Sequence, residues 1–240
     1  LEQLKEAAEQ VGVRRGDVVM VHSSLAALGP LQGRRLAEAP RLVAEVLCDT
    51  IGAEGTLVVP AFNFAFCRGE PFDPDATPAE GMGLLSEVVR RMDGARRSTN
   101  PMQSVAAVGP RAAEICDRDA PSAFHPDGPF GALEALDARL LLVGVGLNAA
   151  SAIHLAEERC EVPYRYWKEF TGRCRTGAGW RSRSYRMFVR DLDIDPRLDM
   201  RPVEEELRRH DLLAGVRLGA GRVLSCTVRA VVGAAERCLR

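Results

Sequence analysis

LLLVGVGLNAASAIHLAEE, residues 140–158, is the strongest local signal in the sequence. Its first part, residues 140–145, is apolar and uncharged, which is typical of a strand buried on both faces. Glycines then interrupt the run, and Ser151 is a suitable N-cap for a helix over residues 151–160. A buried strand that leads directly into a helix predicts an α/β sheet.

The rest of the chain continues this alternation. Further strands are expected at residues 18–21, 56–60 and 104–108, and helices at residues 1–10, 40–51, 84–92, 110–116, 202–213 and 226–239. From residue 171 the arginine-rich segment GRCRTGAGWRSRSYRMFVR predicts a β-hairpin with a glycine-rich turn. We therefore predict an α/β fold, layered α/β/α around a central mixed sheet, plus a C-terminal β-hairpin element. We expect a single domain over residues 1–240, in which the hairpin and an acidic loop, residues 171–200, form a subsidiary lobe.

Composition limits the classes of function. The chain has 240 residues, 46% of them hydrophobic, and a formal net charge of −1, so neither nucleic acid nor a membrane is an expected partner. Seven cysteines without a CxxC pair indicate neither a disulfide framework nor a zinc site, and we expect no bound metal. The start, LEQLKEAAEQ, predicts an amphipathic helix instead of a signal sequence, so a cytoplasmic location is expected.

The segment HLAEE offers an acid–base pair. His154 and Glu157 are three residues apart and therefore share one face of the predicted helix, with Glu158 beside them. A carboxylate that accepts the N–H of one imidazole nitrogen raises the basicity of the other nitrogen, as a general base requires. The alternative interpretation is a capping or surface pair.

Two segments place polar groups near predicted strand ends. VHSSLAALGPLQG brings His22, Ser23 and Ser24 to the end of the first strand, where such groups suit the phosphates or amides of an extended cofactor. A plain turn with an N-cap serine is the alternative. RRST places Arg97 and Ser98 ahead of another strand, and a guanidinium group suits phosphate geometry. The hairpin arginines form either an anion site or a solvated face.

Alternating acids follow the hairpin. Asp191, Asp193 and Asp195 would share one side of an extended chain, where they would hold a cationic amine or orient a histidine. Exposed loop acids are the alternative. His125, in the loop segment AFHPDGPFG, either binds substrate or satisfies a loop carbonyl.

The order of these segments is distinctive. The succession VHSSLAALGPLQG, GTLVVPAFNF, RRSTNPMQSVAAVGP, HPDGPF and LLLVGVGLNAASAIHLAEERCEVPY resembles the aminoglycoside 3-N-acetyltransferase family. The resemblance covers residues 16–165 and is weaker through the hairpin. It implies an acyl-CoA-dependent N-acetyltransferase that uses acetyl-CoA as cosubstrate, in a family associated with antibiotic resistance.

The resemblance also implies roles for individual residues. His154 matches the histidine of the family's HLAE segment, which is regarded as the catalytic base, and Glu157 matches its glutamate. The family's later acidic element falls on Asp191 or Asp193. The residues that fall in segments lining the CoA site are His22, Ser23, Ser24, Arg97 and Ser98.

Two departures from the family pattern lie near the expected substrate side. The family commonly has His-Pro after the Arg-Ser pair, where this chain has Asn100-Pro101, and Ser-Pro after the loop histidine, where it has Pro129-Phe130. Asparagine does not titrate, so a proton-handling role at that position is lost. The residues that we assign to substrate binding are Asn63, Asp73, Asn100 and His125.

The sequence thus predicts transfer of an acetyl group from acetyl-CoA to a primary amine of an aminoglycoside or a related amine, by direct attack in a ternary complex with His154 as general base. One alternative is acylation of a non-aminoglycoside amine, such as an anionic phosphonate- or nucleotide-linked one. Others are covalent catalysis by Cys67 or Cys160 and a non-catalytic acyl-CoA-binding protein. The expected partners are a small-molecule amine and acyl-CoA, and a homodimer is one alternative for the assembly.

Overall fold

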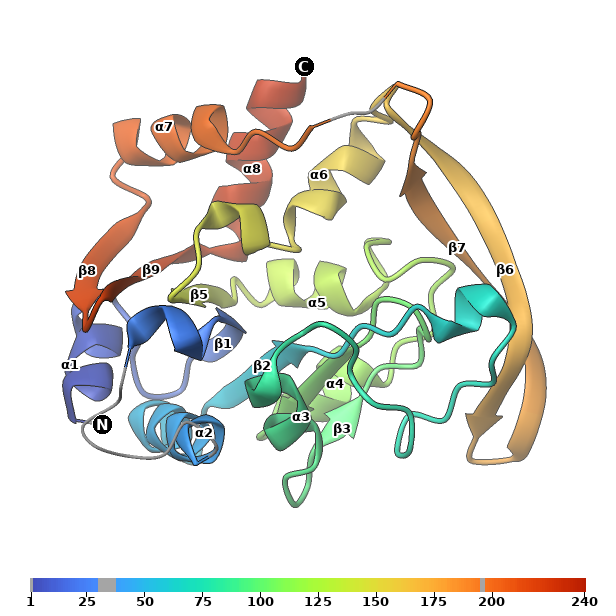
Figure 1. The fold of residues 1–240 in the computed structure, drawn as a ribbon, viewed down its shortest axis with the longest axis horizontal. Coiled ribbons are helices and arrows are strands. Elements are labelled where there is room, and N and C mark those ends of the chain that lie inside the picture. The colour runs from blue at the N-terminus through green and yellow to red at the C-terminus, as the bar shows by residue number, and fades with distance from the viewer. Residues whose placement is uncertain (1, 30–37, 195–196) are drawn as a thin grey trace.

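The computed structural model describes residues 2–29, 38–194 and 197–240. The strands of its main sheet are, in spatial order, β3 (Arg96–Arg97), β4 (Val105–Val108), β2 (Thr56–Pro60), β1 (Val18–Ser23), β5 (Arg139–Val143), β9 (Gly221–Thr227) and β8 (Ala214–Leu218). A second, antiparallel sheet consists of β6 (Arg165–Thr176) and β7 (Gly179–Arg190), which lie along one side of the molecule (Figure 1). The predicted α/β class, with a central mixed sheet and a hairpin, is confirmed.

Three parallel strands form the centre of the main sheet. β1 pairs in parallel with both of its neighbours. Its pairing with β2 begins at Val18↔Thr56, and its pairing with β5 ends at Ser23↔Val143. Every other pairing in this sheet is antiparallel. The carboxyl ends of the three parallel strands therefore meet at one edge, which is where α/β sheets bind ligands.

Helices cover both faces of the main sheet. One face packs against α1 (Glu2–Gln10), α2 (Ala39–Ile51) and α3 (Leu84–Arg90). The other face packs against α4 (Ala112–Cys116), α5 (Pro129–Ala135), α6 (Ile153–Arg159), α7 (Arg201–Arg209) and α8 (Val228–Leu239). Short 3-10 helices lie at η1 (Leu25–Leu28), η2 (Ala65–Arg68) and η3 (Leu147–Ala149). Among the residues described, no helix is long and apolar enough to cross a membrane.

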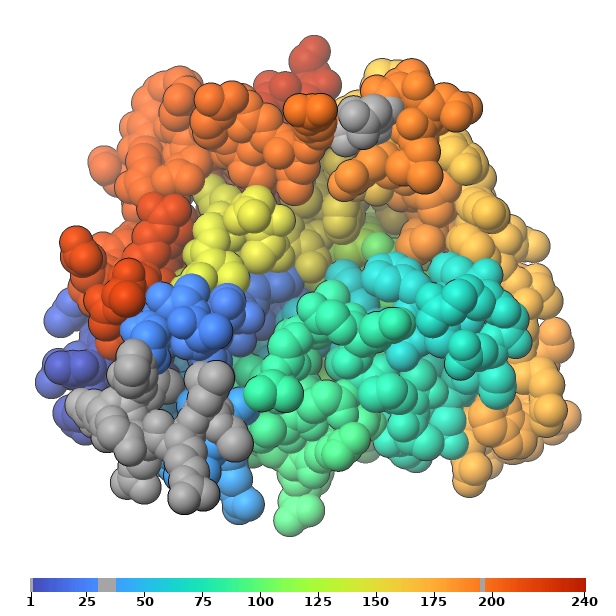
Figure 2. Space-filling model, viewed as in Figure 1, coloured from blue at the N-terminus to red at the C-terminus, as the bar shows by residue number. Residues whose placement is uncertain are grey.

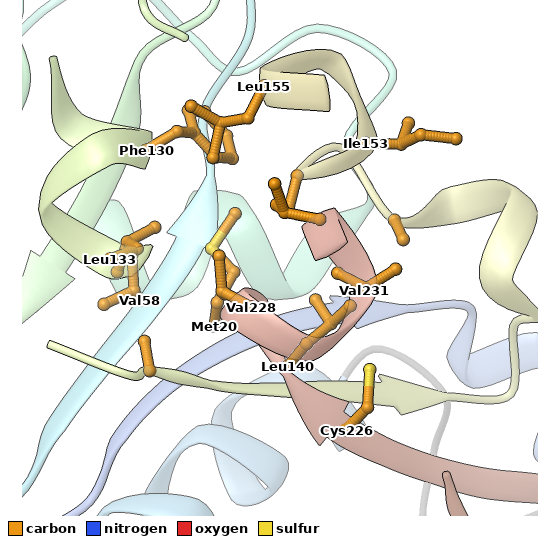
Figure 3. Packing of buried hydrophobic residues seen from close by; sticks show 14 of the residues in the cluster. Met20, Val58, Phe130, Leu133, Leu140, Ile153, Leu155, Cys226, Val228 and Val231 are labelled. Carbon is orange, nitrogen blue, oxygen red and sulfur yellow. The ribbon is translucent and has the colours of Figure 1, made fainter. Parts of the chain in front are cut away.

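Alternating side chains of the central strands supply both cores. Leu140 and Leu142 of β5 belong to the cluster under α5, α6 and α8, whereas Leu141 and Val143 belong to the cluster under α1 and α2. Figure 3 shows the first cluster, in which Leu140 lies among side chains from the neighbouring strands and helices. Burial on both faces explains why this strand is an uninterrupted apolar run in the sequence.

Several elements differ from the sequence-based expectation. The segment predicted as the start of a helix at residue 226 belongs instead to β9, which pairs with β5 from Leu140↔Cys226 to Val143↔Val223, and α8 begins at Val228. β8, β9 and α5 were not expected. Their sequences are short and interrupted by glycine, so their periodicity is weak, and their conformation depends on tertiary pairing.

The hairpin is as predicted but begins at Arg165, ahead of residue 171. It docks on the main body through a small core of Phe66, Phe72, Met102, Cys174 and Tyr185. The backbone of Phe72 extends the hairpin, because its N–H donates to Arg173 O at 2.9 Å and its carbonyl accepts from Arg175 N at 2.8 Å. Figure 2 shows the hairpin against the segment of residues 61–81.

Leu141 tests the assignment of β5 as the buried centre. It is fully buried, so we expect Leu141→Ala to lower the free energy of unfolding by about 2–5 kcal/mol. Leu212, which is 42% exposed, provides the matched control, and Leu212→Ala should cost less than about 1 kcal/mol. Urea denaturation with an unchanged m-value measures both. Equal effects of the two substitutions would contradict the assignment.

Candidate active site

His154 and Glu157 lie together on α6, as their spacing predicts. Nδ1 of His154 is hydrogen-bonded to Oε2 of Glu157. The Glu157 side chain is 2% exposed and that of His154 is 26% exposed, so the imidazole is accessible and its partner is not. A carboxylate on Nδ1 selects the tautomer with a free lone pair on Nε2, which is the form a general base needs.

Two residues at the base of the hairpin hold the Glu157 carboxylate. The Tyr164 hydroxyl donates to Oε1 at 3.1 Å, and Nε of Arg165 lies 3.0 Å from Oε2 in an ion pair. Burial opposes ionisation of Glu157, but the hydrogen bond to His154 and the charge of Arg165 outweigh it and lower its pKa. Burial, followed by the Glu157 charge, raises the pKa of Tyr164 to about 12. Glu157 is therefore a fixed anion.

The aromatic ring of Phe124, in a loop, packs against His154. The Phe124 ring meets the imidazole edge-on, with centroids 5.0 Å apart, and its other neighbour is Phe130 at 4.3 Å. Ser122 fixes this loop, because its hydroxyl accepts from Phe124 N at 3.1 Å and lies 2.8 Å from both carboxylate oxygens of Glu158. Ser122 was not singled out from the sequence, since only the fold brings it to α6.

Glu158 is the second acid beside the histidine, and its environment differs from that of Glu157. Burial raises the pKa of Glu158 to about 7, although the Ser122 hydrogen bond and the charges of Arg186 and Arg165 oppose the rise. The two neighbouring carboxyl groups therefore differ in character: one is a fixed anion, and the other is neutral over part of the physiological range.

The acids after the hairpin lie elsewhere. Asp191 N donates to Tyr164 O at 2.9 Å, and its carboxylate accepts from Asp193 N at 3.0 Å, so the chain turns here and does not extend as a strand. No hydrogen bond or ion pair joins either acid to His154 in the described part of the chain. Asp195 lies outside the described residues.

A cavity of about 550 Å³ opens at the carboxyl ends of β1 and β2. Residues from five segments line it: His22, Ser23, Ser24, Leu25, Ala26, Pro40, Pro60, Phe62, Gly81, Met82, Gly83, Leu84, Val145, Ala149 and Ser151. Its walls are mostly apolar. The structure thus brings His22, Ser23 and Ser24 together at one cavity, at the sheet edge where the sequence predicted a ligand.

Arg97 and Ser98 do not line this cavity. The Arg97 guanidinium donates to the carbonyls of Ala61 and Thr77 and to Ser104 Oγ at 2.9 Å, and burial lowers its pKa to about 10. Ser98 is fully buried, and its hydroxyl accepts from Val105 N at 2.9 Å. In the structure Arg97 fixes the 61–81 loop on the sheet, whereas Ser98 bonds to Val105 of β4.

The residues assigned to substrate binding also make local contacts. Asn63 accepts from Ala65 N at 2.8 Å and donates to Pro78 O at 3.0 Å. Asp73 accepts from Asp75 N at 3.0 Å and lies 3.6 Å from Arg175 Nε. Asn100 accepts from Met102 N at 3.1 Å and from Gln103 N at 2.9 Å, whereas its buried Nδ2 has no partner in the described chain. His125, 39% exposed, accepts from Asp127 N at 3.1 Å.

The described residues contain no evident metal centre, and the environment of Cys67 does not activate its thiol. They contain no group of three or more His, Cys, Asp or Glu side chains that would hold a metal ion. Burial raises the pKa of the Cys67 thiol, although Lys168 and Arg68 oppose it. A raised thiol pKa disfavours the thiolate that nucleophilic catalysis requires.

The chain also resembles known proteins in sequence. The family model described as aminoglycoside 3-N-acetyltransferase matches residues 20–240. Aminoglycoside N(3)-acetyltransferase IV of Salmonella sp is 36% identical over 156 residues, which cover 64% of this chain and 57% of that relative. Aminoglycoside N(3)-acetyltransferase III of Enterobacter cloacae is 32% identical over 182 residues, which cover 68% of this chain and 62% of that relative. The chain thus matches less than two thirds of the length of each relative.

Solved structures share the fold over nearly the whole chain. AAC-IIIb, in a binary complex with CoASH, superposes with a TM-score of 0.85 at 22% identity, covering 98% of this chain and 94% of that one. The apoenzyme of aminoglycoside acetyltransferase AAC(3)-IVa superposes with a TM-score of 0.77 at 26% identity, covering 99% of this chain and 87% of that one.

Glu158 gives the site a measurable pH signature. Because its pKa is raised from 4.5 to about 7 on folding, the folded state binds the proton more tightly, and wild-type stability is lost as pH rises through this window. Glu158→Gln mimics the protonated acid, so its stability relative to wild type should grow between pH 4.5 and 7, by on the order of 2 kcal/mol. Urea denaturation at several pH values measures this.

The exposed Glu205 on α7 supplies a matched control. Glu205→Gln should keep the wild-type pH dependence, because the substitution removes an acid that lies in solvent. A constant stability difference between Glu158→Gln and wild type from pH 4.5 to 8 would refute the assigned protonation of Glu158.

Proposed function

The chain belongs to the aminoglycoside 3-N-acetyltransferase family, and from this premise we propose that it transfers the acetyl group of acetyl-CoA to a primary amine of an aminoglycoside or a related amine. The observation that carries the proposal is the accessible His154 on its buried carboxylate, Glu157, three residues after Ser151, which lines the cavity at the parallel strand ends. Because the chain matches less than two thirds of its relatives' length, their names alone do not establish its activity.

The proposed base acts through Nε2 of His154. Nδ1–H donates to Glu157, so Nε2 takes a proton from the acceptor amine as the amine nitrogen attacks the thioester carbonyl carbon. The tetrahedral intermediate then collapses, the C–S bond breaks, and His154 returns the proton to the CoA sulfur. Glu157 stabilises the imidazolium between these two transfers, because its own charge is fixed by Arg165 and Tyr164. General-base catalysis of this kind contributes on the order of 10²–10⁴-fold.

The cavity beside α6 is the proposed site for the acyl end of acetyl-CoA. Ser23 and Ser24 offer hydroxyls at its mouth, and Phe62 and Met82 supply apolar wall for the pantetheine chain. Arg97 donates to the carbonyl of Ala61, the residue before Phe62, so its proposed contribution to CoA binding is to support the wall. Acetyl-CoA is a metabolite of the cytoplasm, and we place the reaction there. All residues proposed for this site come from one chain.

An anionic amine is a second candidate acceptor, favoured by the charge of the hairpin. Residues 165–190 carry eight basic side chains and a single acid, Glu169, although the whole chain has a net charge of −1. An aminoglycoside carries several ammonium groups and would be repelled by this surface, whereas an amine that also bears a phosphate or carboxylate would be attracted. The acids of the 61–81 loop, including Asp73, favour the aminoglycoside.

His154→Ala tests the proposed reaction. Release of CoA thiol from acetyl-CoA is measured with a panel of aminoglycosides and of anionic primary amines. We expect turnover with one class and a fall in kcat on the order of 10²–10⁴-fold in His154→Ala, because the amine loses its proton acceptor. Glu157→Gln should lower kcat with little change in KM for acetyl-CoA.

His210→Ala is the matched control, since His210 directly follows α7, its side chain is 53% exposed, and it contacts Glu206. It should retain wild-type turnover. Full activity of His154→Ala would eliminate the proposed base, and an absence of CoA release with every amine would eliminate the proposed function.

A further inference from the structure

His22 is a buried polar residue without a partner. It is the last residue but one of β1, lies opposite Leu142 of β5, and is 6% exposed. Its Nε2 is buried and has no hydrogen-bond partner among the described residues. The ring nevertheless lines the cavity at the strand ends, together with Ser23 and Phe62.

This arrangement is unfavourable for folding alone. A buried donor or acceptor without a partner costs about 1–3 kcal/mol, and nearly all such groups in proteins are satisfied. The inward-facing residues that precede His22 on the same face of β1 are Val18 and Met20, so an apolar side chain would continue the core at lower cost. A histidine in this position indicates a group that supplies the missing hydrogen bond when bound.

The surroundings of His22 define the chemistry of that group. Burial lowers the pKa of His22 to about 4, so the imidazole is uncharged near neutral pH and one of its nitrogens carries a hydrogen. A neutral donor between apolar walls such as Phe62 and Leu25 does not match a phosphate, which needs compensating charge. It matches an uncharged carbonyl oxygen, to which it donates.

We propose that His22 is a further catalytic residue, whose Nε2–H donates a hydrogen bond to the thioester carbonyl oxygen of acetyl-CoA bound in the cavity. The inference rests on the proposed function. Ser151 also lines the cavity, and the His154 N–H donates to the Ser151 carbonyl at 3.1 Å, so the base lies one helical turn beyond the cavity rim. Because Nε2 itself is buried, the proposal requires the His22 ring to turn toward the cavity when the ligand binds.

The hydrogen bond acts on the charge that develops in the reaction. As the amine nitrogen bonds to the carbonyl carbon, the π electrons of the C=O bond move to oxygen, and His22 donates to this oxyanion without losing its proton. The oxyanion then re-forms the C=O bond, the thiolate leaves, and the proton taken by His154 goes to sulfur. An uncharged imidazole needs no reorientation of water to stabilise the oxyanion, which is the basis of preorganised catalysis.

His22→Leu and His22→Gln separate this role from a structural one. His22→Leu removes the donor but fits the apolar core, so its thermal midpoint should equal or exceed that of wild type while kcat falls on the order of 10²–10³-fold. The side-chain amide of His22→Gln reaches the position of Nε2 and should restore part of the lost kcat. His210→Leu, an exposed histidine replaced in the same way, should leave kcat unchanged.

The affinity for free CoA tests whether His22 donates its hydrogen bond to the thioester carbonyl and not to another part of the ligand. Free CoA lacks the thioester carbonyl, so His22→Leu should bind it with a Kd within about threefold of wild type, a difference below 1 kcal/mol. The carbonyl stretch of acetyl-CoA labelled with ¹³C at the thioester carbon should lie at lower frequency in wild type than in His22→Leu, and this readout needs no acceptor amine.

The outcomes distinguish the two proposals. Wild-type kcat in His22→Leu, or a Kd for free CoA raised tenfold or more, would overturn the role of His22 and leave the proposed function standing. Unchanged carbonyl frequencies in wild type and His22→Leu would overturn it as well. A shifted carbonyl in a protein that acetylates no amine would support His22 and overturn the proposed function.

Discussion

The buried carboxylate of Glu157 is the constraint on which the candidate site depends. With 2% of its side chain exposed, it is stable as an anion only while other groups compensate its charge. Those groups come from two places in the chain: His154 from the same helix, and Tyr164 and Arg165 from the start of the hairpin. The position of α6 and the base of the hairpin are therefore fixed by one charge, which also orients the imidazole.

Buried polar side chains hold the irregular segments around this centre. Arg97 fixes the 61–81 loop through backbone carbonyls, and Asn63 closes the same loop on Pro78. Ser122 joins the loop that carries Phe124 to Glu158 on α6. Apart from short backbone pairings such as that of Phe72 with the hairpin, these loops depend on a few specific side-chain contacts, and the site is only as rigid as those contacts.

Local patterns predicted the centre of the fold and of the site. The apolar run at Leu140 and the three-residue spacing of His154 and Glu157 are properties of neighbouring residues, so they are readable from the chain. Arg97 is different. An arginine beside serine looks the same whether its partner is a phosphate or a set of loop carbonyls, because the partners lie far away in sequence. β9 was missed for the same reason, since its pairing with β5 fixes its conformation.

Unfavourable groups gather near the cavity and α6. Burial lowers the pKa of His22, and its Nε2 has no hydrogen-bond partner among the described residues. Burial also raises the pKa of Glu158, which lies on α6 with His154. Each lowers stability in a region otherwise packed with apolar side chains, whereas the cores on both faces of the sheet contain few polar groups. Where a sequence otherwise suits its fold, a residue that does not suit its surroundings usually has a functional role. In the role proposed for His22, the free energy lost there is recovered when a thioester carbonyl accepts its hydrogen bond, so binding of acetyl-CoA and stability should be coupled through this residue.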